Sequence, residues 1–387
     1  MSIFRTFSSA ASRPFYTPPI TGINNPNYWE LVKTFPDGMN DGKTLWVSED
    51  NSIVYEGGYK WTLANGVYVN TLNTWVDVNG LTFDGKFSIN LFTENFVTGP
   101  GGGSYDGIAE FLQLNQAGNW EVEQSFSFQG RLTPQSGAPR RNYFSSSSGG
   151  TAAVLMYLLN WLGNDAAVTT FFKKINETWY ILRTEGKDTQ NNISLGSDIE
   201  IAYSGDGDTL ATSGGAFCAI YKYTGNLADP FVQTAYFIGS DTGGIIKMFL
   251  NANGTVLLII RQILISSTSS GATYQMRYST YELTNNTWQQ FGNAITFNIF
   301  HLHGEYMFPN GQLLSEDGTK FVTVKSTNGS DRIVEVYKRN GTSWALLGSG
   351  ITGNRIGSCI FFNENGGRLS ISKDRTYTPV QQYVYVQ

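Results

Sequence analysis

The residues best suited to chemistry in this sequence are its two histidines, which both lie in the segment 300–305, FHLHGE. Alternate side chains of a β-strand share a face, so His301, His303 and Glu305 would form a two-histidine, one-carboxylate set suited to a divalent metal. The alternative is a strand or loop whose polar groups are hydrogen-bonded within the protein. Because no further histidine accompanies them, we predict no metal site and no cofactor, and these three residues are the candidates to inspect.

A pair of carboxylates, Asp198 and Glu200, is a second candidate because both would lie on one face of a strand. Glycoside hydrolases use two carboxylates of this kind. We favour the interpretation in which the two carboxylates are solvated or line a central funnel of the fold. Because the whole chain has only two histidines, we do not expect a nucleophile–histidine–acid triad. The sequence therefore predicts no catalytic residues.

A glycine-rich segment at 99–104, GPGGGS, superficially resembles a phosphate-binding loop. It lacks the Lys-Ser/Thr pair that reaches the phosphates, and no helix is expected after it, so a loop between strands is favoured. Binding of nucleic acid is also excluded, because the net charge is −5 and the 26 basic residues are scattered. No run of 18 apolar residues occurs, which predicts that no segment spans a membrane. The two cysteines, Cys218 and Cys359, lie in apolar strand-like runs and are expected to be buried thiols.

The composition shows which elements must carry these residues. Aromatic residues make up 14% of the chain and charged residues 15%, and there are 43 glycines. Few charges with many aromatics and turn-forming residues are typical of short strands joined by tight turns. The predicted fold class is all-β.

Aromatic residues recur along the chain at intervals of about fifty residues, which is the period of a β-propeller blade. An asparagine-containing turn precedes most of them, as in NTW at 73–75 and NETW at 176–179. We name these residues the anchor aromatics: Trp29, Trp75, Trp120, Trp179, Phe231, Trp288 and Trp344.

A tight-turn sequence built on Asp-Gly, Asn-Gly or a related pair falls between successive anchors. It occurs at 48–51, 83–86, 204–207, 251–254, 315–318 and 363–366, and in the remaining unit, which matches the repeat least well, the segment 145–150 (SSSSGG) takes its place. Such pairs supply the positive φ angles of two-residue hairpins. Each unit therefore reads as four antiparallel strands, and seven units predict a seven-bladed β-propeller.

The two ends of the repeat complement each other. The chain stops at an aromatic strand, 383–386, which elsewhere leads to the next anchor, and the missing anchor strand is found at Trp29. We therefore expect the N-terminal strand to complete the last blade and close the ring, which removes two exposed sheet edges. The predicted organisation is an extended arm at 1–28 and a propeller at 29–387.

The repeat resembles FG-GAP-like repeats of the integrin α-chain type, on the segments 288–295 (WQQFGNAI) and 344–351 (WALLGSGI). The resemblance implies a propeller without catalytic activity. The calcium loop of that family, Asp-x-Asp-x-Asp-Gly, is not reproduced, since the nearest sequence, Asp206-Gly207-Asp208, lacks the third carboxylate.

These observations predict a non-catalytic structural or interaction propeller with a protein partner in a larger assembly. The partner would be bound through residues 1–28 and the blade loops, and a virion or cytoplasmic assembly is the favoured setting. The segment 1–28 has two arginines, four prolines and no acid, and it lacks the apolar stretch of a secretory signal. The same composition is typical of a mitochondrial presequence, but we interpret the segment as a retained arm. A carbohydrate-binding propeller is the alternative, and a secreted glycoside hydrolase is the third hypothesis.

Overall fold

A computed structural model describes most of the chain from Tyr28 onward. The described residues are 28–35, 45–48, 52–56, 59–65, 67–70, 87–99, 102–115, 119–132, 143–146, 152–161, 164–186, 200–214, 216–238, 243–302, 310–326, 331–354, 356–362, 366–373 and 380–386. The arm predicted at 1–28 therefore lies outside the described residues except for Tyr28 itself, and so does Trp75.

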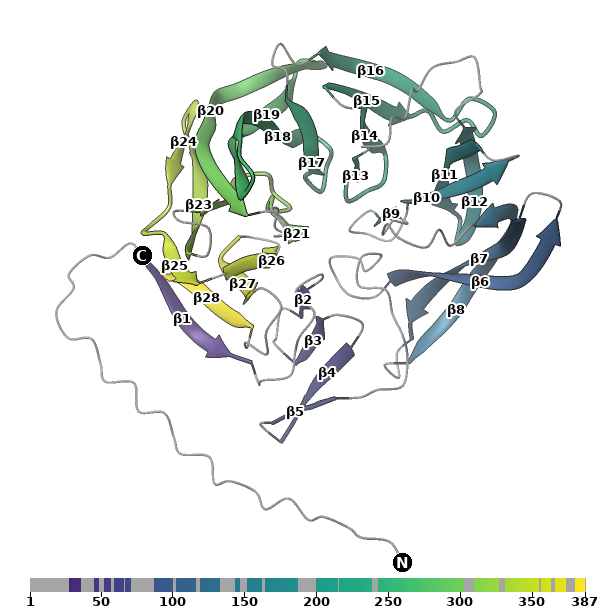
Figure 1. The fold of residues 1–387 in the computed structure, drawn as a ribbon, viewed down its shortest axis with the longest axis horizontal. Helices are drawn as coiled ribbons and strands as arrows, with labels where there is room; N and C mark the ends of the chain where they lie inside the picture. Colours follow the sequence, from purple (N-terminus) through teal and green to yellow (C-terminus); the bar gives the residue numbers. More distant parts are fainter. Residues whose placement is uncertain are drawn as a thin grey trace, which may run out of the picture.

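The described residues form antiparallel sheets arranged in a ring, which is a β-propeller arrangement (Figure 1). Three sheets have four strands in simple sequence order. The first contains β2 (Leu45–Val47), β3 (Ile53–Glu56), β4 (Tyr59–Ala64) and β5 (Val67–Asn70). The second contains β13 (Ile201–Tyr203), β14 (Thr209–Gly214), β15 (Phe217–Tyr223) and β16 (Phe231–Ile238). The third contains β17 (Gly244–Leu250), β18 (Val256–Ser267), β19 (Gly271–Thr284) and β20 (Thr287–Leu302).

Two further sheets each match one predicted unit with small changes. In one, β22 (Lys320–Ser326) pairs with β23 (Asp331–Asn340), which pairs with both β24 (Ser343–Leu346) and β25 (Ile351–Asn354). The other runs in the order β1, β28, β27, β26 and β21. Its strands are β1 (Tyr28–Thr34), β21 (Asn310–Gln312), β26 (Ile356–Phe362), β27 (Arg368–Lys373) and β28 (Gln381–Val386). The short strand β21 adds to this sheet in parallel to β26, which a four-stranded unit does not include.

The remaining sheet departs from the expected separation of the units, because its seven strands belong to two of them. One group is β6 (Phe87–Gly99), β7 (Gly102–Leu114) and β8 (Trp120–Leu132), and the other is β9 (Tyr143–Ser146), β10 (Ala152–Trp161), β11 (Asn164–Ile175) and β12 (Thr178–Gly186). A single residue pair, Leu159 with Leu132, links the two groups. The hydrogen-bonded sheets of the described residues are thus six, where the sequence predicted seven separate blades. In the glycine-rich segment, Gly99 at the end of β6 pairs with Gly102 at the start of β7, as expected of a connection between strands.

The predicted closure of the ring is confirmed. Strand β1 pairs antiparallel with β28, with Trp29 opposite Tyr385 and Tyr28 opposite Val386. The rings of Trp29 and Tyr385 lie 5.5 Å apart. Segments from the two ends of the repeat therefore form one sheet, with β1 at its outer edge (Figure 1).

The hairpins that precede two of the anchor aromatics have the backbone that their sequences predict. Asn176 and Glu177 have φ angles of 48° and 61°, and Asn285 and Asn286 have φ angles of 50° and 59°. Two successive residues of positive φ are characteristic of the type I′ turn, whose twist matches that of the flanking strands.

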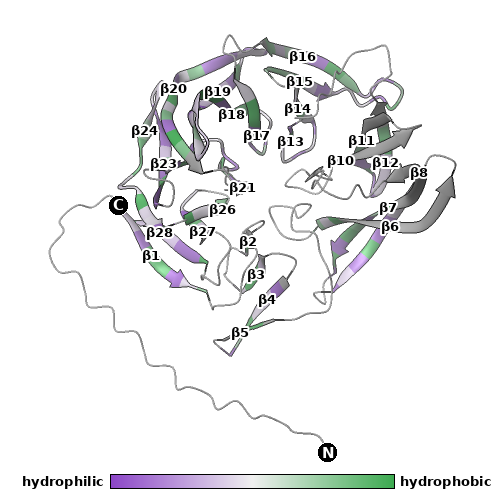
Figure 2. Cartoon of the chain, viewed as in Figure 1, coloured by the Kyte–Doolittle hydropathy of each residue, from purple (hydrophilic) through white to green (hydrophobic). Residues whose placement is uncertain are grey.

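The core lies between neighbouring sheets. In β18, residues 256–261 are all buried and alternate between two neighbours. Leu257 and Ile259 pack with residues of the β13–β16 sheet, whereas Leu258 and Ile260 pack with residues of the β22–β25 sheet. Figure 2 shows the same distribution, with apolar residues concentrated in inner strands such as β17 and a mixture of polar and apolar residues in outer strands such as β1. The described part of the chain contains no helix that is long and apolar enough to cross a membrane.

Candidate functional site: the contacts that join neighbouring sheets

The histidine segment is only partly described. His301 lies near the end of β20, opposite Ala272 of β19, while His303 and Glu305 lie outside the described residues. Within the ranges given above, no group of three or more histidine, cysteine, aspartate or glutamate side chains could hold a metal ion. The metal set of His301, His303 and Glu305 therefore stays untested.

The carboxylate pair is also only partly described, because Asp198 lies outside the described residues. Glu200 is 5% exposed, and the Nζ atom of Lys247 lies 3.5 Å from its carboxylate. Glu200 thus contributes to a contact between β17 and the segment before β13. Both cysteines are buried thiols outside any disulfide, as expected, and burial raises the pKa of the Cys218 thiol to about 12, despite the opposing charge of Arg261. A thiol with so high a pKa is a poor nucleophile.

The anchor aromatics that the structure describes pack on the preceding sheet or, inside the seven-stranded sheet, on the preceding group of strands. Trp179 of β12 is the clearest case, at 2% exposure. Its ring lies 5.0 Å from that of Phe87 and 4.4 Å from that of Phe111, which belong to β6 and β7. Phe231 of β16 likewise lies 5.6 Å from Phe171 of β11. Trp288 of β20 is buried in the cluster that contains Cys218 and other residues of the β13–β16 sheet.

Four anchor tryptophans also donate a hydrogen bond from Nε1. The acceptor lies on the preceding sheet or, for Trp29, at Leu347, directly after β24 of that sheet. The distances are 3.0 Å for Trp29 to the Leu347 carbonyl, 3.0 Å for Trp120 to Tyr55 Oη, 3.0 Å for Trp179 to Glu123 Oε2 and 2.7 Å for Trp344 to Thr280 Oγ1. A buried indole needs such a partner, since an unpaired N–H loses its bond to water on burial. The four acceptors differ in chemical type, although the donor is the same.

The tight turns hold a second set of contacts. We name the turns at 204–209, 251–256 and 315–320 the turn ladder. In the third turn, the Ser315 hydroxyl donates to Asp317 at 2.6 Å and accepts from the Lys320 N–H at 3.0 Å. Asp317 also accepts from the N–H of Thr319 at 2.9 Å and from its hydroxyl at 2.7 Å. The pKa of Asp317 is lowered, because these hydrogen bonds to the carboxylate and the nearby Lys320 outweigh its burial, which alone would raise the pKa.

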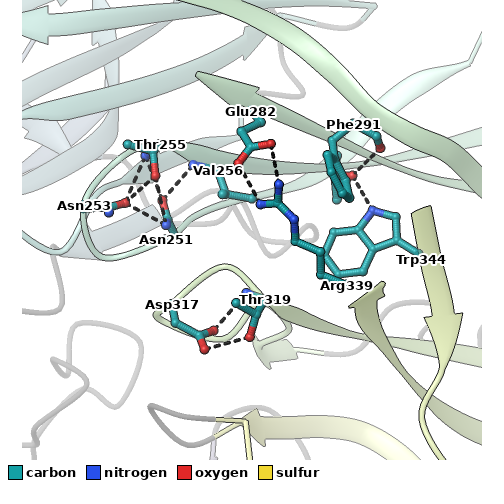
Figure 3. Close-up of polar contacts among 11 residues, drawn as sticks. Asn251, Asn253, Thr255, Val256, Glu282, Phe291, Asp317, Thr319, Arg339 and Trp344 are labelled. Atoms are coloured by element: carbon teal, nitrogen blue, oxygen red, sulfur yellow. Dashed lines mark hydrogen bonds and ion pairs between the residues drawn. The ribbon is translucent and has the colours of Figure 1, made fainter. Parts of the chain in front are cut away.

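The turn at 251–256 keeps this geometry with amides in place of the hydroxyl and carboxylate. The Asn251 side-chain oxygen accepts from the N–H groups of Thr255 and Val256, each at 2.8 Å. Asn253 accepts from the Asn251 amide at 2.7 Å and from the Thr255 hydroxyl at 2.6 Å. Figure 3 shows this turn beside the one that holds Asp317 and Thr319.

Backbone hydrogen bonds connect each turn of the ladder to the next. The Asp206 N–H donates to the Ala252 carbonyl at 3.1 Å, and the Ala252 N–H donates to the Glu316 carbonyl at 2.8 Å. At the start of the ladder, the ammonium of Lys173 donates to the Asp206 carbonyl at 3.0 Å and to Asp208 at 2.7 Å. A side chain of β11 thus donates to the first turn, at a carbonyl one position further along the turn than those of Ala252 and Glu316.

Two glycines of the ladder are packed against the preceding turn. A Cβ atom at Gly254 would lie 2.7 Å from Thr209 Cβ and 3.0 Å from Ser204 Cβ. One at Gly318 would lie 2.8 Å from Val256 Cγ2. Since both glycines also have positive φ angles, 66° and 70°, the turns require glycine for both backbone conformation and close approach.

A charged contact reinforces one junction nearer the rim. Arg339 of β23 donates to both carboxylate oxygens of Glu282 on β19, at 2.7 and 3.0 Å. Its guanidinium also lies 4.2 Å from the centroid of the Phe291 ring (Figure 3). The fork geometry of arginine suits such a bidentate pair.

Comparison with known proteins adds little to this picture. No model of a protein family matches the chain, and no curated protein matches it. The FG-GAP-like character of the repeats therefore stays a prediction. Among solved structures, a chain of the mitotic checkpoint complex is 11% identical over 99% of both chains, with a TM-score of 0.48.

Two structures of other kinds are similar at the same level. A Bacteroides uniformis protein with the provisional name 6-phosphogluconolactonase is 12% identical over 86% of this chain and 88% of its own, with a TM-score of 0.47. A polysaccharide lyase, an ulvan lyase, is 9% identical over 92% and 96%, with a TM-score of 0.44. Likenesses of this size carry no argument about function.

The described contacts hold neighbouring sheets together. For each contact, the sequence predicted only one of the two partners. It identified the anchor tryptophans and the turns, but it gave no sign of the acceptors Tyr55, Glu123 and Thr280. The signal that would find them is a polar side chain on a strand of the preceding unit, but such residues are common on strands. Lys173 was missed for a similar reason, because its partners, the Asp206 carbonyl and the Asp208 carboxylate, belong to another unit.

Proposed function

We propose that this chain is a seven-bladed β-propeller that acts as a non-catalytic structural and interaction module within a larger assembly. The observation that carries the proposal is the apolar surface of the outer strands. Nine side chains there are between 40% and 53% exposed: Leu31, Val32, Val69, Val122, Tyr180, Ile181, Val232, Tyr236 and Leu346. Exposed apolar side chains on six outer strands offer a broad contact surface around the rim.

The count of seven is supported by the packing inside the seven-stranded sheet. One residue pair joins its two groups of strands, whereas Trp179 of the second group stacks on Phe87 and packs at a tilt on Phe111 of the first. Contacts of this second kind are the ones that join separate sheets elsewhere in the ring. The repeat type belongs to the same proposal and rests on the FG-GAP-like segments 288–295 and 344–351.

The non-catalytic character is supported by how the conspicuous polar residues are used. Glu200 is paired with Lys247, and the carboxylates of Asp206 and Asp317 are hydrogen-bonded within their own turns. Each of these groups therefore has a structural role in the described residues.

The position of β1 suggests how the arm would be presented. Because β1 is the outermost strand of its sheet, the chain that precedes Tyr28 begins at the rim, next to the exposed side chains of Leu31 and Val32. We propose that residues 1–28 and the adjoining rim bind a protein partner, in a virion or a comparable cytoplasmic assembly.

The test is a truncation that removes residues 1–27 and keeps Tyr28, which pairs with Val386. The native assembly and a reconstitution with truncated protein are compared by native mass spectrometry and sedimentation. We expect the truncated protein to keep its thermal unfolding midpoint but to be absent from the assembly. A second variant, Val232→Ser with Tyr236→Ser, tests the rim without altering the arm. Incorporation of both variants at the level of the full chain would contradict the proposal.

A carbohydrate-binding propeller is the second candidate, because three tyrosines of outer strands are exposed: Tyr28, Tyr180 and Tyr236. Exposed rings of this kind can stack on sugars. A glycan array separates the candidates. Binding that is lost on Tyr180→Ala or Tyr236→Ala would favour a lectin, and hydrolysis of a bound glycan would revive the third hypothesis, a glycoside hydrolase.

A further inference from the structure

The tripeptide Asn-Gly-Thr occurs in two turns that the structure describes, at 253–255 in the turn ladder and at 340–342 between β23 and β24. Gly254 and Gly341 both have positive φ angles, 66° and 57°. In an Asn-Gly pair the backbone nitrogen of glycine can approach the asparagine side chain, because glycine has no Cβ atom to hinder it. Since the residue types are identical, the surroundings decide which pair is open to this attack.

The pair in the turn ladder is held in place. The Asn253 side-chain oxygen accepts from the Asn251 amide at 2.7 Å and from the Thr255 hydroxyl at 2.6 Å. The Gly254 N–H, which would have to attack, donates to the Asn251 carbonyl at 3.1 Å. The turn also packs on the preceding one, since a Cβ atom at Gly254 would lie 2.7 Å from Thr209 Cβ. An attack here must break these hydrogen bonds and move a packed backbone.

The pair between β23 and β24 lies in the open. Asn340 and Gly341 are both exposed, and a Cβ atom at Gly341 would meet no atom within 4 Å. Asn340 pairs with Ser343 through the backbone, and its carbonyl accepts from the Ser343 hydroxyl at 3.1 Å. No described residue binds the side-chain amide of Asn340 or the N–H of Gly341. Both reacting groups are therefore available to each other.

We propose that Asn340 is a site of spontaneous deamidation, with water as the co-reactant. The Gly341 nitrogen attacks the Asn340 Cγ atom and forms a C–N bond, while its proton passes to solvent. The side-chain nitrogen takes a proton from solvent and leaves as ammonia. Water then opens the resulting cyclic imide at either carbonyl, which gives aspartate or isoaspartate. The site is independent of the proposed role in an assembly.

The product would change the hairpin that positions an anchor aromatic. Trp344 follows the turn at the start of β24, and its Nε1 atom donates to Thr280 of the neighbouring sheet at 2.7 Å. Either product adds a negative charge at Asn340, and isoaspartate also inserts a methylene group into the backbone between β23 and β24. The modification therefore acts beside the junction of the β17–β20 and β22–β25 sheets.

The test is incubation of the full chain at neutral pH, followed by peptide mapping with mass spectrometry at successive times. We expect Asn340 to be converted about tenfold faster than Asn253 or more, because reaction at Asn253 must first break several hydrogen bonds. The control is the same chain unfolded in urea. There the two identical tripeptides should be converted at similar rates, since the turns that distinguish them are lost.

A variant identifies the attacking atom. Gly341→Ala adds a Cβ atom to the residue that supplies the nitrogen, and it should slow the conversion of Asn340 without accelerating that of Asn253. The rate at Asn253 in this variant also reports whether the turn ladder is still folded. Equal rates at Asn253 and Asn340 in the folded chain would reject the site. So would an intact Asn340 in the folded chain when the unfolded chain is converted, or a wild-type rate at Asn340 in Gly341→Ala.

Discussion

The turn ladder and the anchor aromatics join neighbouring sheets by different means. In the ladder, backbone groups make the connection, as in the bond from the Asp206 N–H to the Ala252 carbonyl. At the anchors, tryptophan side chains make the connection. Trp179 donates to a carboxylate, while Trp344 donates to a hydroxyl. Backbone donors and acceptors are the same in every unit, but side-chain acceptors are free to vary. The ladder therefore constrains the sequence strictly at its turns, and the anchors constrain only the aromatic residue.

The largest expected effect belongs to an anchor. Trp179→Ala removes a ring that is 2% exposed and contacts Phe87 and Phe111. We expect the free energy of unfolding to fall by about 3–5 kcal/mol, as for other buried aromatic residues replaced by alanine. Chemical denaturation measures the change. Trp179→Phe should lose less, because it keeps a ring. Tyr180→Ala, on the exposed side of the same strand, is the control, and an equal loss at both positions would contradict the anchor role.

The ladder is tested at Gly254, where an alanine would combine two penalties. Its φ angle is 66°, and its Cβ would lie 2.7 Å from Thr209 Cβ in the preceding turn. We expect a loss of about 2 kcal/mol or more, of which about 1 kcal/mol comes from the backbone conformation alone. Gly341→Ala is the matched control, because Gly341 has a φ angle of 57° and open space around it. Equal changes in the unfolding midpoint would show that contact between turns adds nothing.

This comparison explains how much of the fold could be predicted from the sequence. The ladder turns were predicted because a positive φ angle leaves few alternatives to Gly and Asn, so the motif recurs in six of the seven predicted units. Closure of the ring was predicted because Trp29 supplied the anchor missing after Tyr383-Val384-Tyr385-Val386. The link between Leu132 and Leu159 was not predicted, since a single backbone pair at the ends of long strands leaves no mark in the residue types.

The functional residues were less accessible to prediction for a related reason. The chemistry of a side chain can be read from the sequence, but its partner across a junction cannot, because the partner lies in another unit. Glu200 illustrates this limit, since the sequence suggested an acid pair with Asp198 and the structure pairs it with Lys247.

A smaller effect on the free energy of unfolding is expected at two threonines, Thr280 and Thr323, because only one of them has a hydrogen-bonded hydroxyl. Thr280 accepts from Trp344 Nε1 at 2.7 Å and donates to the Phe291 carbonyl at 3.0 Å. The Thr323 hydroxyl is buried without a partner. We expect Thr280→Val to lower the free energy of unfolding by about 1–2 kcal/mol and Thr323→Val to leave it unchanged or raise it by up to about 1 kcal/mol. Thermal unfolding of the two variants measures the difference, and changes of the same sign would contradict the account of the Trp344 anchor.

The smallest expected effect distinguishes two turns within the ladder. Asp317 has a lowered pKa in the folded protein, so its contribution to stability is present above the unfolded pKa and is lost as the pH falls through the folded pKa. The equivalent residue of the turn at 251–256, Asn253, does not titrate. Asp317→Asn should therefore give the third turn the pH response of the second. We expect the wild type to lose stability relative to Asp317→Asn below a pH of about 4, measured as unfolding midpoints between about pH 6 and 2.5. Parallel curves for the two proteins would mean that the hydrogen bonds of this turn do not depend on the charge of Asp317, and that amide and carboxylate turns are interchangeable in the ladder.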